Sequence, residues 1–174
     1  MFSKIKCAIL LASFCLASCA PATLYVDTNP AINERMKSAK IVFSKPAKLL
    51  VSYSVYRGET KEEALKNATD DVERITKAVE NHVPPQLASA LQKKGVASGS
   101  DVIISLRPTV GWGETNDTAR ILLEVSIQTS DRTKQPWIAR FSEGRRASAT
   151  AEQTAQVFTD RIVLELVKAG FVPQ

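Results

Sequence analysis

Cysteine is scarce in this chain of 174 residues, and its three copies all fall within the first nineteen. They are Cys7, Cys15 and Cys19, so residues 20–174 contain no thiol. A domain built from those residues has no disulfide bond, no zinc–thiolate centre and no cysteine nucleophile. Its stability must come from a packed apolar core, which a chain of this length can form without covalent staples.

Histidine is scarcer still, because His82 is the only one. A Ser–His–Asp hydrolase would need it, but no nucleophile-elbow serine motif accompanies it. His82 stands just before Val83-Pro84-Pro85 at the end of a helical pattern, where the helix dipole commonly stabilises a histidine. Asp70 and Glu73 each have a basic residue four positions on, as solvated helix faces do. The sequence therefore predicts a protein that is not an enzyme and that uses no cofactor or metal.

No apolar run approaches the roughly 20 residues that a transmembrane helix needs. The run near the N-terminus, Ile9-Leu10-Leu11-Ala12, is short and follows Lys4 and Lys6. A basic start, a short apolar centre and small residues before a cleavage site are typical of a secretory signal peptide. We therefore predict that residues 1–18 are removed.

The motif Leu16-Ala17-Ser18-Cys19 resembles the bacterial lipobox. This resemblance implies that Cys19 becomes the first mature residue and carries fatty acyl chains, such as palmitate, that hold the protein in a bilayer. Several chains make such anchoring stable. Ala20 follows the cysteine, where the inner-membrane retention signal of many such lipoproteins is an aspartate. The resemblance therefore implies a lipid anchor in the periplasmic face of a bacterial outer membrane.

The mature chain begins with a segment that has little apolar periodicity. Residues 19–38 include Pro21 and Pro30, and we predict a lipidated tether there that spans about 60 Å when fully extended. A single domain is expected over residues 39–174. The loss of Lys4 and Lys6 with the signal lowers the formal charge from +5 to +3. This mild charge, without a basic stripe, argues against nucleic acid as a partner.

The apolar pattern predicts an α+β domain with the order β-β-α-β-β-β-α. Thr60-Lys61-Glu62-Glu63 is a capping box that begins the first helix, and Thr150 begins the last. Pro84-Pro85 is expected to break or kink the first helix, and residues 86–94 are expected to form a second helical piece. Alternating strands are predicted at residues 41–43, 49–56, 101–108, 119–129 and 137–141. Short links between the last three favour an antiparallel meander, and we expect a two-layer, mostly antiparallel sheet with the helices on one face.

Residues 87–141 carry a further pattern: a helix ending in Lys-Gly-Val, a strand opening with Asp-Val-Ile-Ile, and a strand running to a polar turn and a tryptophan. This pattern resembles the small domain shared by the curli-secretion lipoprotein and the N-terminal part of the Tol-system periplasmic protein. The resemblance implies a role in envelope assembly.

Two segments supply candidate partner-binding residues. Trp112 lies between Gly111 and Gly113, in what we predict to be an exposed polar loop that also holds Glu114, and tryptophan is enriched where partners bury it. The alternative is that Trp112 folds back onto the sheet edge, where the glycines give it room. Arg145 and Arg146 are predicted in the loop before the last helix, where they would meet solvent, an acidic partner or anionic lipid headgroups.

These observations predict a lipid-anchored, non-catalytic envelope protein that binds another envelope protein during assembly or transport. Its partners would be the bilayer, through acylated Cys19, and that second protein. Two alternatives stay open: a module that binds a small ligand or lipid between sheet and helices, and an envelope-polymer hydrolase that uses carboxylates.

Overall fold

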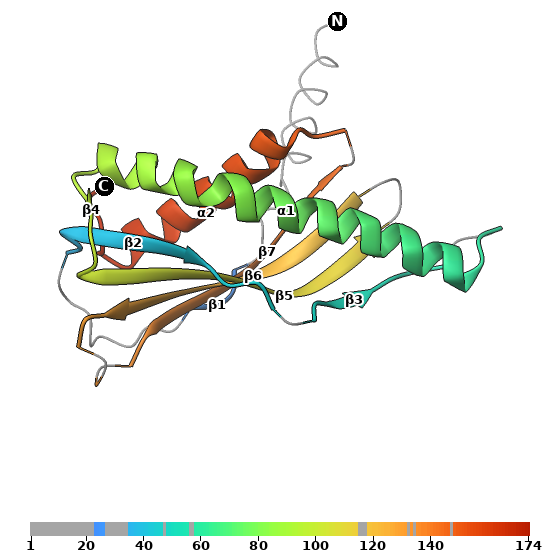
Figure 1. The fold of residues 1–174 in the computed structure, drawn as a ribbon, viewed down its shortest axis with the longest axis horizontal. Helices are drawn as coiled ribbons and strands as arrows, with labels where there is room; N and C mark the ends of the chain where they lie inside the picture. The colour runs from blue at the N-terminus through green and yellow to red at the C-terminus, as the bar shows by residue number, and fades with distance from the viewer. Residues whose placement is uncertain are drawn as a thin grey trace, which may run out of the picture.

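The computed structural model describes residues 23–26, 35–46, 48–55, 58–114, 118–131, 133, 135–146 and 148–174. The predicted signal peptide and lipobox, with Cys19, lie outside them. Seven strands form one sheet, and two helices cover one of its faces (Figure 1). The elements in chain order are β1 (Thr23–Val26), β2 (Ser38–Phe43), β3 (Leu50–Ser52), α1 (Lys61–Lys93), β4 (Ala97–Ser98), β5 (Val102–Glu114), β6 (Thr118–Thr129), β7 (Trp137–Arg146) and α2 (Ala151–Lys168).

The sheet is mixed, with the order β1-β7-β6-β5-β2-β4 and with β3 also pairing with β5. The predicted meander is confirmed, because β5, β6 and β7 pair antiparallel in sequence order. Three short strands add parallel pairs: β2 pairs with the first half of β5, β3 with its second half, and β4 with β2. The α+β class and the two-layer arrangement with helices on one face are therefore as predicted.

Helix α1 continues through Pro84-Pro85, so the prediction of a separate helical piece at residues 86–94 is wrong. Its capping box forms as expected, with the Glu63 amide donating to the Thr60 hydroxyl and the Thr60 amide donating to the Glu63 carboxylate. An interior proline costs a helix roughly 3 kcal/mol. Four fully or almost fully buried side chains span the prolines, and burying each contributes roughly 1.5–3 kcal/mol; they are Val79, Val83, Leu87 and Leu91. Tertiary packing therefore outweighs the local preference.

The core lies between the sheet and the two helices. On β6, Ile121, Leu123, Val125 and Ile127 point toward the helices and are buried, as period-2 alternation requires. Phe158, Ile162 and Leu166 of α2 and Phe141 of β7 fill the same layer. This close packing leaves the other face of the sheet without a helix (Figure 1).

Two parts of the predicted tether belong to the folded structure. Strand β1 pairs antiparallel with β7, with Thr23 opposite Phe141 and Val26 opposite Ala139. Met36 is buried, and its amide donates to the Phe171 carbonyl. A four-residue strand with no periodic flanks carries no signal in the sequence, so its place in the sheet could be found only from the fold.

Candidate functional site: the open face of the sheet

The face of the sheet that points away from α1 and α2 is called here the open face. Alternation along the strands assigns each side chain to it, because residues two apart share a face. On β5 and β6 these residues alternate with the buried residues that face the helices. The open face carries Lys40, Ile103, Arg107, Val110, Trp112, Arg120, Leu122, Glu124, Ile138 and Arg140.

Gly111-Trp112-Gly113 lies within β5 and not in a loop, so the predicted exposed loop is wrong over residues 111–114; residues 115–117 are outside the described part of the chain. The two glycines make room for α1. A Cβ atom on Gly111 would lie 2.4 Å from Val72 Cγ1, and one on Gly113 would lie 2.3 Å from Ala68 Cβ. Alternation then directs Trp112 to the open face.

Trp112 is half-buried, whereas Tyr53 is exposed at 36%. Trp112 is therefore not the exposed loop residue that its flanking glycines predict. Trp112 lies opposite Arg120 on β6 and Ser52 on β3, so strands flank it on both sides. Pairing on both sides explains why a tryptophan on an uncovered face keeps only part of its surface in contact with solvent.

The structure brings the strand positions of all four candidate partner-binding residues to one end of the sheet. In register, Glu114 lies opposite Thr118, which lies opposite Arg146, and Trp112 is two residues before Glu114. Arg145 lies opposite Ala119, whose side chain is on the helix side, so Arg145 belongs to the other face. Both arginines lie in β7 or at its end, not in a loop as predicted, because β7 continues to Arg146.

A row of three charged residues crosses the middle of the open face on β5, β6 and β7. Arg107, Glu124 and Arg140 are direct cross-strand neighbours. Arg107 Nε and Nη2 donate to Glu124 Oε1 at 3.1 and 2.5 Å, and Arg140 Nε donates to Glu124 Oε2 at 2.6 Å. Both oxygens of the single carboxylate are therefore engaged, one by each arginine, in charge-assisted hydrogen bonds.

The arginines shield Glu124 from water while they stay accessible themselves. The side chain of Glu124 is 10% exposed, and those of Arg107 and Arg140 are 54% and 38% exposed. Burial raises the pKa of Glu124, but the hydrogen bonds and positive charges of the two arginines outweigh it, so the pKa lies below its usual range. The carboxylate is thus ionised at neutral pH and balances one of its two cations.

The open face is therefore cationic and partly apolar. Four basic residues stand on it against one acidic residue among the described side chains: Lys40, Arg107, Arg120 and Arg140 against Glu124. Half-buried apolar side chains lie between them, at Ile103, Val110, Trp112, Leu122 and Ile138. Arginine and tryptophan are the residue types most enriched at the energetic centres of protein interfaces.

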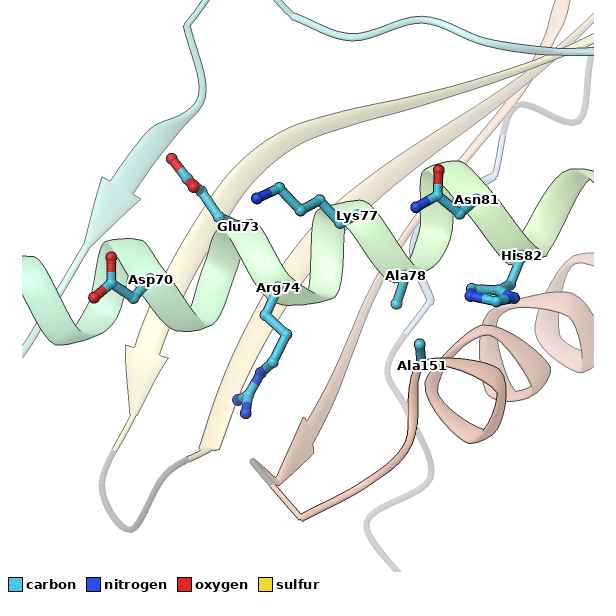
Figure 2. Close-up of a pocket in the computed structure, with 8 residues that line it drawn as sticks. All are labelled: Asp70, Glu73, Arg74, Lys77, Ala78, Asn81, His82 and Ala151. Atoms are coloured by element: carbon cyan, nitrogen blue, oxygen red, sulfur yellow. The ribbon is translucent and has the colours of Figure 1, made fainter.

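A groove where α1 meets the first turn of α2 holds the only histidine (Figure 2). Ala78 and Ala151 face one another across the helix contact, and His82 lies beside that turn (Figure 2). His82 Nε2 is 4.0 Å from Glu152 Oε1, on the solvent-exposed start of α2. Asp70 and Glu73 line the same groove, but they lie on earlier turns of α1 and do not point toward His82 (Figure 2). The arrangement gives no support to the carboxylate hydrolase.

One buried carboxylate lies on the helix side of β7. Glu143 is 7% exposed, and its Oε1 has no hydrogen-bond partner among the described residues; the same is true of Arg161 Nε on α2. Burial raises the pKa of Glu143, and the charges of Arg161, Arg145 and Arg120 oppose this rise only in part. The described residues contain no cluster of three or more histidine, cysteine or carboxylate side chains that could hold a metal ion.

No helix in the part of the chain that the structure describes is both long enough and apolar enough to cross a membrane. No family model matches the chain, and no curated protein sequence matches it.

Several solved structures have a loosely similar fold. They include a PelC dodecamer from Paraburkholderia phytofirmans, 10% identical over 80% of this chain and 92% of that chain, with a TM-score of 0.39. A DUF330 protein from Xanthomonas campestris is 19% identical over 86% and 94%, with a TM-score of 0.44. A minor lipoprotein from Acinetobacter baumannii is 15% identical over 79% and 97%, with a TM-score of 0.33. These likenesses are too loose to carry an argument about function.

Sequence reasoning found Trp112 and missed the charged row beside it. Arg107 and Arg140 lie in predicted strands, and alternation assigns each of them to the face of its strand that does not point into the core. Their common contact with Glu124 depends on the register between three strands, which the sequence does not fix. The available signal is Glu124 itself. It is an acidic residue in a predicted strand whose two predicted neighbours, residues 101–108 and 137–141, each contain one arginine.

Proposed function

We propose that this protein is a lipid-anchored, non-catalytic protein of the bacterial envelope that binds another envelope protein through the open face of its sheet. The anchor is Cys19, and the location is the periplasmic face of the outer membrane, as the lipobox and Ala20 imply. The observation that carries the proposal is the open face: a cationic row with a half-buried tryptophan, on a sheet side that neither helix covers.

Charge complementarity indicates the nature of the partner surface. Arg107 and Arg140 share one carboxylate, so the row keeps an excess positive charge, and Lys40 adds to it. Opposite potentials across an interface guide association and exclude wrong partners. We therefore expect the partner to present an acidic patch with apolar side chains around it.

The alternative of a ligand held between sheet and helices finds less support. Side chains with almost no exposure fill that space, among them Phe141, Phe158, Leu87, Ile121 and Leu166. The surface groove that holds His82 is lined mostly by polar and charged residues. A binding module of that kind usually has a concave apolar pocket.

Reversing one charge on the open face tests the proposal. In Arg107→Glu, a like charge would face the acidic partner, and we expect recovery of the crosslinked partner from intact envelopes to fall about tenfold or more, equivalent to about 1.4 kcal/mol. Lys77→Glu is the matched control, because Lys77 is an exposed basic residue on α1, in the other layer. Equal recovery with both variants would contradict binding through the open face.

Arg107→Glu also places a second carboxylate beside Glu124, so its folding must be checked by thermal unfolding. Trp112→Ala is the second variant, because it leaves every charge in place. We expect it to reduce partner recovery as well, since truncating a central aromatic residue of an interface typically costs about 2 kcal/mol or more of binding.

A further inference from the structure

The chain between the lipid anchor and the sheet is short. Strand β1 fixes Thr23 opposite Phe141. Four peptide units separate Cys19 from Thr23, and a fully extended chain of four residues spans at most about 14 Å. If Cys19 carries the acyl chains, the folded sheet cannot stand about 60 Å from the bilayer, as the predicted tether of residues 19–38 would allow.

The direction of β1 determines which end of the sheet is close to the anchor. Because β1 runs antiparallel to β7, its N-terminal end lies on the side of β7 that continues from Phe141 to Arg146. Arg146 is five residues beyond Phe141, about 17 Å along a strand. Even when the chain is fully extended, Cys19 therefore ends just short of the level of Arg146. The end of the sheet where β5 finishes, β6 begins and β7 finishes is called here the hairpin end.

The exposed apolar side chains gather at this same end. The described residues include five large hydrophobic side chains that are exposed: Leu50, Tyr53, Val55, Leu65 and Leu164. The first four belong to β3, the residues after it and the start of α1, which lie together at one end of the molecule, away from the C-terminus (Figure 1).

Register and packing place these residues at the hairpin end. Strand β3 runs parallel to β5 with Ser52 opposite Trp112, so the chain leaving β3 heads toward the level of Glu114. Ala68 of α1 packs against Gly113, and Leu65 lies almost one turn earlier in the helix, near its N-terminal end. Arg145 stands on β7 at the same end.

We propose that the hairpin end lies against the phospholipid headgroups of the membrane that holds Cys19, with Tyr53, Val55 and Leu65 in the boundary between headgroups and acyl chains. This inference rests on the proposed acylation of Cys19. Apolar and aromatic side chains with neighbouring cations are the composition of interfacial membrane contacts. The contact orients the domain, so that the C-terminal end of α1 and the chain terminus point away from the bilayer.

Quenching of an added tryptophan by brominated phospholipids tests this orientation, because the quenching requires close contact with the lipid. Leu65→Trp places the probe at the hairpin end, and Leu164→Trp is the matched control, since the two leucines are 42% and 44% exposed on helix surfaces. Each mature protein, beginning at Cys19, is attached to vesicles of phosphatidylethanolamine and phosphatidylglycerol. The fluorescence of the parent protein, with Trp112 and Trp137, is subtracted.

The attachment is made in two ways: through the natural acyl chains, and through a maleimide lipid coupled to the thiol of unacylated Cys19. We expect most of the added fluorescence at position 65 to be lost and that at position 164 to be retained. Equal quenching at both positions, or stronger quenching at position 164, would overturn the orientation. Absence of lipid on Cys19 by mass spectrometry would instead refute the proposed anchor, and the maleimide arm would still decide the orientation.

Discussion

Replacing Gly113 with alanine is expected to destabilise the domain strongly. The new Cβ would lie 2.3 Å from Ala68 Cβ and 2.7 Å from Ala68 Cα, so both the side chain and the backbone of α1 stand in its way. Neither can rotate aside, and the helix must move off the sheet and loosen the packing of Ala68 and Val72. Overpacking of this kind typically costs about 1–3 kcal/mol of stability. We expect the free energy of unfolding, measured by heat or denaturant, to fall by an amount near the upper end of this range.

A complementary pair provides the control for this effect. Ala68→Gly removes the Cβ atom that the new methyl group would meet. The double variant with Gly113→Ala should therefore recover part of the lost stability. The recovery is reduced by the roughly 1 kcal/mol that a glycine costs in a helix interior. Ser105→Ala, on the open face of the same strand, should change stability little. A Gly113→Ala protein that unfolds like the parent would show that α1 does not pack closely on β5.

Replacing Cys19 with serine is expected to leave an unprocessed or soluble protein that carries no lipid. The hydroxyl cannot form the thioether that carries the lipid, and no helix in the described part of the chain could replace the anchor. Labelling with a fatty-acid probe would measure the change, and we expect the label to be lost whether the protein is unprocessed or soluble.

Cys15→Ser is the matched control for this change, because Cys15 lies within the predicted signal peptide and should leave with it. The label in that variant should equal the label in the parent. Equal labelling of the Cys19→Ser protein would contradict acylation of Cys19. Recovery of the parent protein only with inner-membrane fractions would contradict the location that Ala20 implies.

Sequence reasoning predicted the parts of the fold that local patterns determine. The meander of β5, β6 and β7 follows from alternating strands with short links, and the capping boxes at Thr60 and Thr150 fix where both helices begin. Sequence reasoning failed where contacts between residues far apart in the chain determine the structure. Packing of the apolar stripe on both sides of Pro84 keeps α1 whole, and the parallel pairing of β2 and β3 with β5 depends on partners far along the chain.

The candidate site shows the same division. The glycines on both sides of Trp112 predict a loop. In the structure they are needed because α1 packs against the other side of the strand. Arg107 and Arg140 had no distinguishing neighbours in sequence. Only the register of three strands brings them to the two oxygens of Glu124.

Position-resolved photo-crosslinking in intact cells tests most directly whether the open face binds another envelope protein. A photoreactive amino acid would replace Leu122, a half-buried residue of the open face, and in a second protein Leu164, an exposed residue of α2. We predict a discrete crosslinked species of one partner protein from position 122, which Arg107→Glu abolishes, and none of that species from position 164. The same crosslink from position 164, or a crosslink from position 122 that Arg107→Glu leaves unchanged, would contradict binding through the open face.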